Sequence, residues 1–196
     1  MAAGDEALRI ETTPTRIADA LFLGSAYDAA SWWFVHCRIA NVVNCADASA
    51  CGLVTMPFVV SSTTLNALDA PDYPLFERHL APFVDFMVRA RGGGSVMVHC
   101  HEGRNRSVAL LCAMIILVTG GTAADVIAEM RRRRGPGVLT NSTFEDALRK
   151  GEGWLRGVVG EERARALRAA WGEVFRNESG WGELFPAPSP PPTPPP

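Results

Sequence analysis

The residues of this chain that could carry out covalent chemistry stand together in one short polar segment, residues 99–107. The segment contains a cysteine, Cys100, and an arginine, Arg106. A free thiol has a pKa of about 8.5, and its thiolate is the reactive nucleophile. Backbone N–H groups, a helix N-terminus and a guanidinium would favour the thiolate form, and the same groups bind the oxygens of a phosphate. The segment therefore predicts a nucleophile beneath a bound phosphoryl group.

Apolar residues on both sides of this segment predict the elements that position it. Residues 96–98 are Val-Met-Val, which is typical of a buried strand, and residues 108–117 form an apolar run that is typical of a buried helix. A strand, a tight loop and a helix bring several N–H groups and the positive end of a helix dipole to one point. Gly103 lets the loop turn tightly because it has no Cβ. Ser107 could donate a hydrogen bond to the sulfur and ease its departure in a second step.

Length and composition favour a single domain in a reducing compartment. The chain has 196 residues and a formal net charge of −2, which suits one hydrophobic core and disfavours nucleic acid as a partner. We expect no membrane span, because no apolar run is long enough, and no secretory signal in residues 1–11. Five cysteines without a disulfide-type spacing favour a cytoplasmic or nuclear location.

The order of the expected elements predicts an α/β fold, with a central and mostly parallel sheet of about four to five strands flanked by helices. Residues 61–74 are expected to form a polar loop punctuated by prolines. We expect strands in residues 16–23 (two, around a turn), 39–44, 56–60 and 96–98, and helices in residues 27–36, 75–91, 108–117, 123–134, 142–148 and 160–176.

The segment His99-Cys100-x5-Arg106-Ser107, placed between an apolar strand and an apolar helix, resembles the signature of the cysteine-based protein phosphatases. Residues 21–25 (LFLGS) and 41–44 (NVVN) resemble the opening of the small dual-specificity phosphatases. This resemblance implies a cysteine-phosphatase-like fold. It also implies hydrolysis of phosphotyrosine and of phosphoserine or phosphothreonine in proteins through a phosphocysteine intermediate, with no metal and no cofactor.

The resemblance also implies a division of the chain into three parts. Residues 15–178 would be the catalytic domain, residues 1–14 an N-terminal extension, and residues 179–196 a disordered, proline-rich tail. Phosphoproteins are the expected partners. The end of the tail, PAPSPPPTPPP, could also bind an SH3 or WW module in the polyproline II conformation.

Hydrolysis by this route needs a general acid for the leaving oxygen. The resemblance implies an aspartate in the loop before the helix that precedes the signature strand, where Asp69 fits best and Asp72 is the alternative. Cys100 would be the nucleophile, and His99 and Asn141 would order the site. The other catalytic groups would be Arg106 and Ser107, and the expected substrate-binding residues are His101, Glu102, Gly103, Arg104, Asn105 and Arg106.

Three positions of the loop depart from the pattern of many relatives, and at the first of them, Glu102, many relatives have alanine. Arg104 replaces a small or apolar residue, and Asn105 replaces a serine, as in viral dual-specificity enzymes and the related RNA 5′-phosphatases. A second cation at the rim would suit a polyanion, so an RNA 5′-phosphate or a phosphoinositide is an alternative substrate. A solvated rim charge is the simpler interpretation. An inactive phosphate-binding or scaffold protein is a second alternative.

Two further features leave alternatives open. The four arginines of residues 131–134 could complement the dipole of the helix that they end, or they could guide an acidic substrate. Cys45 follows the strand expected in residues 39–44. It could be a small buried hydrophobe, whereas the resemblance implies a cysteine able to form a reversible disulfide with Cys100.

Overall fold

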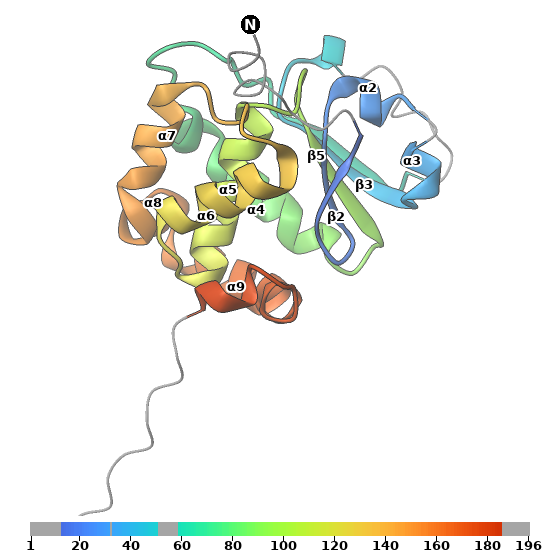
Figure 1. Cartoon of the computed structure of the whole chain (residues 1–196). Helices are drawn as coiled ribbons and strands as arrows, with labels where there is room; N and C mark the ends of the chain where they lie inside the picture. Colours follow the sequence, from blue (N-terminus) through green and yellow to red (C-terminus); the bar gives the residue numbers. More distant parts are fainter. Residues whose placement is uncertain (1–12, 32, 51–58, 186–196) are drawn as a thin grey trace, which may run out of the picture.

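A five-stranded sheet with helices on both sides forms the described part of this computed structural model, which comprises residues 13–31, 33–50 and 59–185 (Figure 1). β1 pairs antiparallel with β2, and the other neighbouring strands pair in parallel. The predicted α/β class with a mostly parallel sheet is confirmed. The strands are β1 (Thr15–Ala18), β2 (Leu21–Gly24), β3 (Ile39–Asn44), β4 (Ser61–Thr64) and β5 (Ser95–His99), in the order β1-β2-β5-β3-β4.

Two short helices lie on one side of the sheet and a group of longer helices lies on the other (Figure 1). The short ones are α2 (Ala26–Ala29) and α3 (Trp33–His36). The longer ones are α4 (Leu75–Ala90), α5 (Arg106–Thr119), α6 (Ala123–Arg134), α7 (Ser142–Arg149), α8 (Gly151–Val159) and α9 (Glu161–Arg176), and short 3₁₀ turns lie at η1 (Ala48–Ala50) and η2 (Gly182–Leu184). Among the described residues, no helix is long and apolar enough to cross a membrane.

The central strand and the central helix follow each other in the sequence. β5 lies between β2 and β3, and its residues Val96, Met97 and Val98 are fully buried. All 14 residues of α5 are buried, because α4, α6, α7, α8 and α9 contact this helix on the side away from the sheet. Burial on all sides explains why both segments are apolar throughout instead of alternating with polar residues.

The parallel direction of β2, β5, β3 and β4 brings the loops that follow them to one edge of the sheet. In sheets of this kind, functional side chains gather beyond the carboxyl ends of the strands. Asp28, Asp47, Asp69 and Cys100 all come from segments that leave this edge. The sheet topology therefore brings together residues that are far apart in the sequence.

The strand predicted in residues 56–60 is wrong where it can be compared with the structure. Residues 56–58 lie outside the described part, residues 59–60 are not in a strand, and the edge strand is β4, Ser61–Thr64. β4 pairs with Asn41–Asn44 of β3 on one side only. An edge strand that is only partly buried needs no apolar side chains, so hydrophobicity did not reveal it.

The single helix predicted in residues 27–36 is also wrong. Ser25 caps α2 through a capping box with Asp28. The Ser31 hydroxyl then donates a 2.9 Å hydrogen bond to the carbonyl of Asp28, and such a local bond competes with continuation of a helix. The chain consequently breaks here, and α3 starts again at Trp33. A further helix, α8, was not predicted.

The packed part of the chain extends beyond residue 178, where the tail was predicted to begin. Trp181 is fully buried, and its Nε1 donates a 2.6 Å hydrogen bond to the carbonyl of Ile17. The Trp181 ring meets the ring of Phe175 edge-on, with 6.2 Å between the centroids. Leu184 and Phe185 pack against the same core, so the predicted boundary is too early. Residues 186–196, and with them the proposed SH3 or WW ligand, lie outside the described part.

We predict that Trp181 stabilises the domain. Trp181→Ala would leave a cavity beneath β1 and should lower the free energy of unfolding by about 3–5 kcal/mol, as measured by urea denaturation. Trp181→Phe keeps an aromatic ring against Phe175 and lacks only the N–H donor and part of the ring. Its free energy of unfolding should therefore decrease by less than that of Trp181→Ala. A Trp181→Ala protein as stable as the wild type would contradict the inclusion of this residue in the core.

Candidate active site

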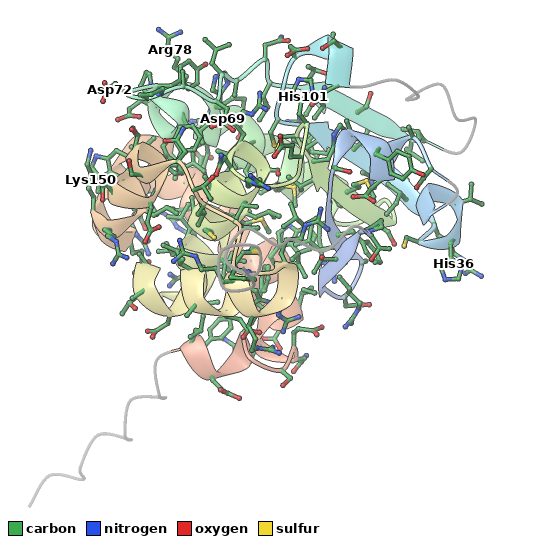
Figure 2. All side chains as sticks on the ribbon, turned by 45° about the horizontal axis from the view of Figure 1, so that its top comes forward. His36, Asp69, Asp72, Arg78, His101 and Lys150 are labelled. Atoms are coloured by element: carbon green, nitrogen blue, oxygen red, sulfur yellow. The ribbon has the colours of Figure 1, made fainter. Side chains whose placement is uncertain are left out.

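The loop between β5 and α5, residues 100–105, lines a pocket at the carboxyl edge of the sheet. The pocket has a volume of about 230 Å³. In Figure 2, Asp69 and His101 lie on the same surface of the molecule, whereas His36 lies at its far end. The lining residues are Asp69, Cys100, His101, Glu102, Arg104, Asn105, Arg106 and Thr140. The structure thus brings the predicted nucleophile, the predicted phosphate ligand and one of the two candidate acids into one pocket.

Cys100 lies at the bottom of this pocket with an exposed fraction of only 1%. Its sulfur accepts a 3.2 Å hydrogen bond from the hydroxyl of Ser107, which is the contact predicted from the sequence. α5 begins at Arg106, and the side chain of Asn105 makes no capping bond to its first turn. The free N–H groups of that turn and the helix dipole can therefore bind an anion above the sulfur.

Gly103 occupies a position of the loop where no side chain fits. Its φ angle is +65°, a conformation that is costly for residues with a Cβ. A Cβ atom at this position would lie 2.5 Å from the carbonyl oxygen of Gly24 and 2.8 Å from a guanidinium nitrogen of Arg134. The loop thus packs directly against the end of β2 and against α6.

Arg106 extends from the first turn of α5 toward the loop that follows β4. Its Nη1 donates a 3.1 Å hydrogen bond to the carbonyl of Ala67, and its Nε lies 3.8 Å from Oδ2 of Asp69. The side chain is mostly buried, so these contacts fix the orientation of the guanidinium inside the pocket. A fixed, planar guanidinium is suited to bidentate binding of a phosphate.

The carboxylate of Asp69 is held on both of its oxygens by amide groups. Asn105 Nδ2 donates to Oδ2 at 3.1 Å, and Asn141 Nδ2 donates to Oδ1 at 2.9 Å. Asp72 differs from Asp69 because it lines a neighbouring hollow beside α4 and α7, and its backbone N–H donates to the Thr143 hydroxyl. The geometry therefore favours Asp69 over Asp72 as the acid of the pocket.

His99 is fully buried under the loop and faces its backbone. Its Nδ1 lies 3.3 Å from the carbonyl oxygen of Cys100, and a carbonyl can only accept, so Nδ1 carries the hydrogen. Burial lowers the pKa of His99 to about 4, with a smaller opposing effect of the bond to the Cys100 carbonyl. The imidazole is therefore neutral at pH 7 and orders the loop.

The charged residues at the rim of the pocket are paired with one another. The Nε of Arg104 lies 3.4 Å from the carboxylate of Glu102. His101 Nε2 lies 3.2 Å from a carboxylate oxygen of Asp47. Hydrogen bonds, first from the Ser49 hydroxyl and then from His101, hold the pKa of Asp47 well below its usual range. Sequence reasoning missed Asp47, which follows β3 and carries no motif of its own.

The arginines at the end of α6 form ion pairs with other parts of the fold. Arg131 pairs with Glu145 of α7 at 2.7 Å, and Arg133 lies 3.6 Å from the carboxylate of Glu178, beyond the end of α9. Arg134 is fully buried behind the loop of residues 100–105, which we call the phosphate loop. It lies 3.6 Å from the buried carboxylate of Asp28. All four arginines lie in the last turn of α6, as the helix-dipole interpretation requires, and Arg131, Arg133 and Arg134 also join α6 to other elements. A role of this run in guiding an acidic substrate stays a prediction.

Cys45 lies beneath the loop as a buried free thiol. Its backbone N–H donates a 2.7 Å hydrogen bond to the carbonyl of His99. Burial raises the pKa of the Cys45 thiol well above its usual range, and the negative charge of Cys100 adds to this rise. The interpretation of Cys45 as a small buried hydrophobe fits these contacts, and a reversible disulfide with Cys100 stays a prediction.

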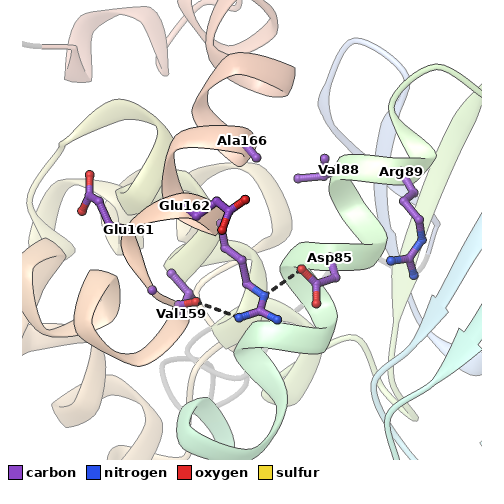
Figure 3. Close-up of a pocket in the computed structure, with 9 residues that line it drawn as sticks. Asp85, Val88, Arg89, Val159, Glu161, Glu162 and Ala166 are labelled. Atoms are coloured by element: carbon purple, nitrogen blue, oxygen red, sulfur yellow. Dashed lines mark hydrogen bonds and ion pairs between the residues drawn. The ribbon is translucent and has the colours of Figure 1, made fainter.

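A larger hollow, of about 500 Å³, lies between α4 and α9 (Figure 3). Arg163 bonds to Asp85 at 2.8 Å and to the carbonyl of Val159 at 3.4 Å across it. The described residues that line this hollow include no cysteine, histidine or serine, so they offer no nucleophile of these types. Among the described residues, no group of three or more histidine, cysteine, aspartate or glutamate side chains is arranged to hold a metal ion.

Comparison with known proteins agrees with this geometry. Residues 21–152 match the dual specificity phosphatase catalytic domain. Dual specificity protein phosphatase 15 of Mus musculus is 29% identical over 124 residues, which are 62% of this chain and 50% of that relative. The chain thus spans about half the length of this curated relative.

Solved structures extend the comparison to the fold. A crystal structure of DUSP15 has a TM-score of 0.68 at 21% identity and covers 83% of this chain and 99% of its own. A mouse putative dual specificity phosphatase, solved in complex with zinc tungstate, has a TM-score of 0.62 at 31% identity and covers 75% of this chain and 91% of its own. The chain belongs to the dual-specificity phosphatase family and carries the catalytic domain of these cysteine-dependent hydrolases.

We predict that Gly103→Ala distorts the phosphate loop. The added Cβ would overlap the Gly24 carbonyl, and the loop would have to move, so the rate on p-nitrophenyl phosphate should fall by at least about 100-fold. Gly157→Ala is the matched control, because Gly157 lies in α8 and a Cβ added there would meet nothing within 4 Å. That variant should keep its activity, and equal activities of the two variants would contradict the prediction.

We predict that His99 makes the stability of the domain depend on pH. The unfolded state binds a proton near pH 6.5 and the folded state only near pH 4, so stability falls as the pH decreases through this window. The loss attributable to His99 is about 3 kcal/mol. His99→Asn keeps a donor near the Cys100 carbonyl and cannot titrate. Urea denaturation from pH 7 to pH 4 should therefore show a flatter curve for this variant, and parallel curves would contradict the prediction.

Proposed function

We propose that this protein hydrolyses phosphotyrosine and phosphoserine or phosphothreonine in proteins through a phosphocysteine intermediate. The observation that carries the proposal is the pocket that Cys100, Arg106 and Asp69 line together. A nucleophile, a phosphate-binding cation and an acid on different elements of one pocket are the three groups that such a reaction needs.

In the first step, the thiolate of Cys100 attacks phosphorus, a sulfur–phosphorus bond forms and the phosphorus–oxygen ester bond breaks. Arg106 and the N–H groups at the start of α5 bind the non-bridging oxygens, where negative charge is concentrated. Asp69 gives its proton to the leaving oxygen, which departs as the free hydroxyl of the substrate side chain. Arg106 and the backbone donors supply the positive charge, so the proposed mechanism requires no metal ion.

In the second step, a water molecule attacks the phosphorus of the phosphocysteine. The carboxylate of Asp69, now ionised, takes a proton from this water, and the sulfur–phosphorus bond breaks. The Ser107 hydroxyl, 3.2 Å from the sulfur, stabilises the departing thiolate by donating its hydrogen bond. Inorganic phosphate leaves, and both Cys100 and Asp69 return to their starting protonation states.

The charges at the rim support a phosphoprotein substrate over a polyanion. Arg104, the cation that suggested an RNA 5′-phosphate or a phosphoinositide, is already paired with Glu102. Asp47 adds negative charge to the same edge. A substrate with several phosphates would meet these carboxylates, whereas a single phosphate ester places its charge at the bottom of the pocket. An inactive scaffold is disfavoured because Cys100, Arg106 and Asp69 line the same pocket.

Hydrolysis of p-nitrophenyl phosphate in the presence of EDTA tests the proposed mechanism. Cys100→Ser should reduce the rate by about 10⁴-fold or more because the nucleophile is lost. Asp69→Ala should cost about 10²–10⁴-fold on a phosphotyrosine peptide. Asp72→Ala is the matched control and should retain most of the wild-type rate.

Three outcomes would contradict parts of this proposal. An inert wild-type protein would favour the scaffold function. A larger loss in Asp72→Ala than in Asp69→Ala would reassign the acid. Faster turnover of an RNA 5′-triphosphate or a phosphoinositide than of phosphopeptides, measured side by side, would replace the substrate class.

A further inference from the structure

The side chain of Asn105 joins three loops at the edge of the pocket. Asn105 is the last residue of the phosphate loop, directly before α5. Its Nδ2 donates a 3.1 Å hydrogen bond to Asp69 in the loop that follows β4. Its Oδ1 accepts hydrogen bonds from the backbone N–H groups of Thr140, at 2.8 Å, and of Asn141, at 3.2 Å. One amide therefore connects the nucleophile's loop, the acid's loop and the loop before α7.

The partners of Asn105 fix which of its two ends faces Asp69. Backbone N–H groups can only donate, so they require the oxygen end of the amide. A carboxyl oxygen that carries no proton can only accept, so Oδ2 of Asp69 requires the nitrogen end. The Thr140 hydroxyl lies 3.2 Å from the same Oδ1 and is compatible with this orientation. The reverse orientation would place an oxygen against a carboxylate and an NH₂ group against two N–H groups.

Few other side chains could make these contacts. Serine has one polar atom and a shorter side chain, so it cannot reach both neighbouring loops. Aspartate has the right shape but would place a second negative charge 3.1 Å from Asp69. The bonds of Asn105 also explain why its side chain leaves the first turn of α5 uncapped. It was predicted to bind substrate, whereas its side-chain bonds run to the protein.

We propose that Asn105 is a positioning residue that holds Asp69 at a fixed distance from the phosphate loop, and that it thereby sets the range of leaving groups that the enzyme can use. This inference rests on the proposed role of Asp69 as the general acid. Asn141 holds the other oxygen of Asp69 and bonds to the Ala70 carbonyl at 3.3 Å. Asn105 differs from Asn141 because it connects the acid to the loop that carries Cys100.

The leaving group determines how much a misplaced acid costs. Nitrophenolate is a stable anion and leaves with little help, whereas tyrosine has a pKa of about 10 and the hydroxyl of serine is a weaker acid still. An alkoxide therefore needs its proton in the transition state. When the Asn105 contact is removed, the decrease in kcat should be small for p-nitrophenyl phosphate, larger for phosphotyrosine and largest for phosphoserine. Damage to the phosphate loop would instead slow all three substrates alike.

The experiment compares the wild type, Asn105→Ser, Asn105→Asp and Asp69→Ala on these three substrates, with the two phosphopeptides identical except for the phosphorylated residue. For Asn105→Ser we expect a loss of kcat of less than about 10-fold on p-nitrophenyl phosphate and of about 100-fold on the phosphoserine peptide. Asn105→Asp should lose more on the phosphopeptides. Inhibition by tungstate, which reports on the phosphate loop alone, should stay within about twofold of the wild type for Asn105→Ser.

A matched control and a double variant separate this inference from the proposed function. Asn177→Ser changes an exposed asparagine at the end of α9 and should leave all rates unchanged. In an Asp69→Ala background, Asn105→Ser should have no further leaving-group-dependent effect, because the two residues act through one proton.

The outcomes are distinguishable. Equal losses of Asn105→Ser on all substrates, together with weaker tungstate inhibition, would overturn the positioning role and return Asn105 to phosphate binding. Asp69→Ala could lose more kcat on the poorer leaving groups, which is a selective loss, while Asn105→Ser shows no such selective loss. This outcome would overturn this inference and leave the proposed function intact. Absence of a selective loss in Asp69→Ala itself would overturn the assignment of the acid, and with it this inference.

Discussion

Under the proposed mechanism, the site has to meet a single electrostatic constraint, which is that a thiolate and a phosphate ester, both anions, must come into contact. At short range in a partly desolvated pocket, two unpaired negative charges repel each other strongly. The pocket offsets this repulsion with hydrogen-bond donors whose positions are fixed. They are the N–H groups at the N-terminus of α5, which is buried along its length, and the guanidinium of Arg106, which bonds to the Ala67 carbonyl. The position of α5 at the centre of the helical layer follows from this requirement, since a frayed or mobile helix end would not keep its dipole on the phosphorus.

The same requirement explains the buried polar residues behind the loop. Asp28 accepts hydrogen bonds from the N–H and the hydroxyl of Ser25, at 2.7 and 2.9 Å, and lies 3.6 Å from Arg134. Buried ion pairs contribute little net stability, because the cost of removing both charges from water is high. The Asp28–Arg134 pair instead has a structural role beside the phosphate loop. Arg134 of this pair lies close to Gly103, where an added Cβ would meet its guanidinium at 2.8 Å, and so supports the backbone of the phosphate loop.

The sequence was most informative where the chemistry is local. Cys100, Arg106 and Ser107 lie within a few residues of each other along the chain, so the motif could be recognised. The flanking strand and helix are both apolar because both are buried on all sides, so these elements could be predicted too. The pairing of Asp28 with Arg134 could not, because four consecutive arginines look alike until the fold brings one of them behind the loop. The contact of Asp47 with His101 and that of Trp181 with Ile17 were not predicted either, because the partners in each pair are far apart in the sequence. β4 was missed because an edge strand of serine and threonine carries no hydrophobic pattern.

Under the proposed function, this enzyme accepts tyrosine, serine and threonine esters, and the backbones of these substrates lie at different distances from the phosphorus. Contacts to the substrate backbone therefore cannot place the acid correctly for all of them. The phosphoryl group and the leaving oxygen bonded to it are the only parts that occupy the same position in each case. Asn105 attaches Asp69, the proposed acid, to the loop proposed to bind the phosphoryl group. The acid is then positioned relative to the feature that all these substrates share. Broad specificity and a rigid connection between acid and nucleophile are then two consequences of one geometric requirement.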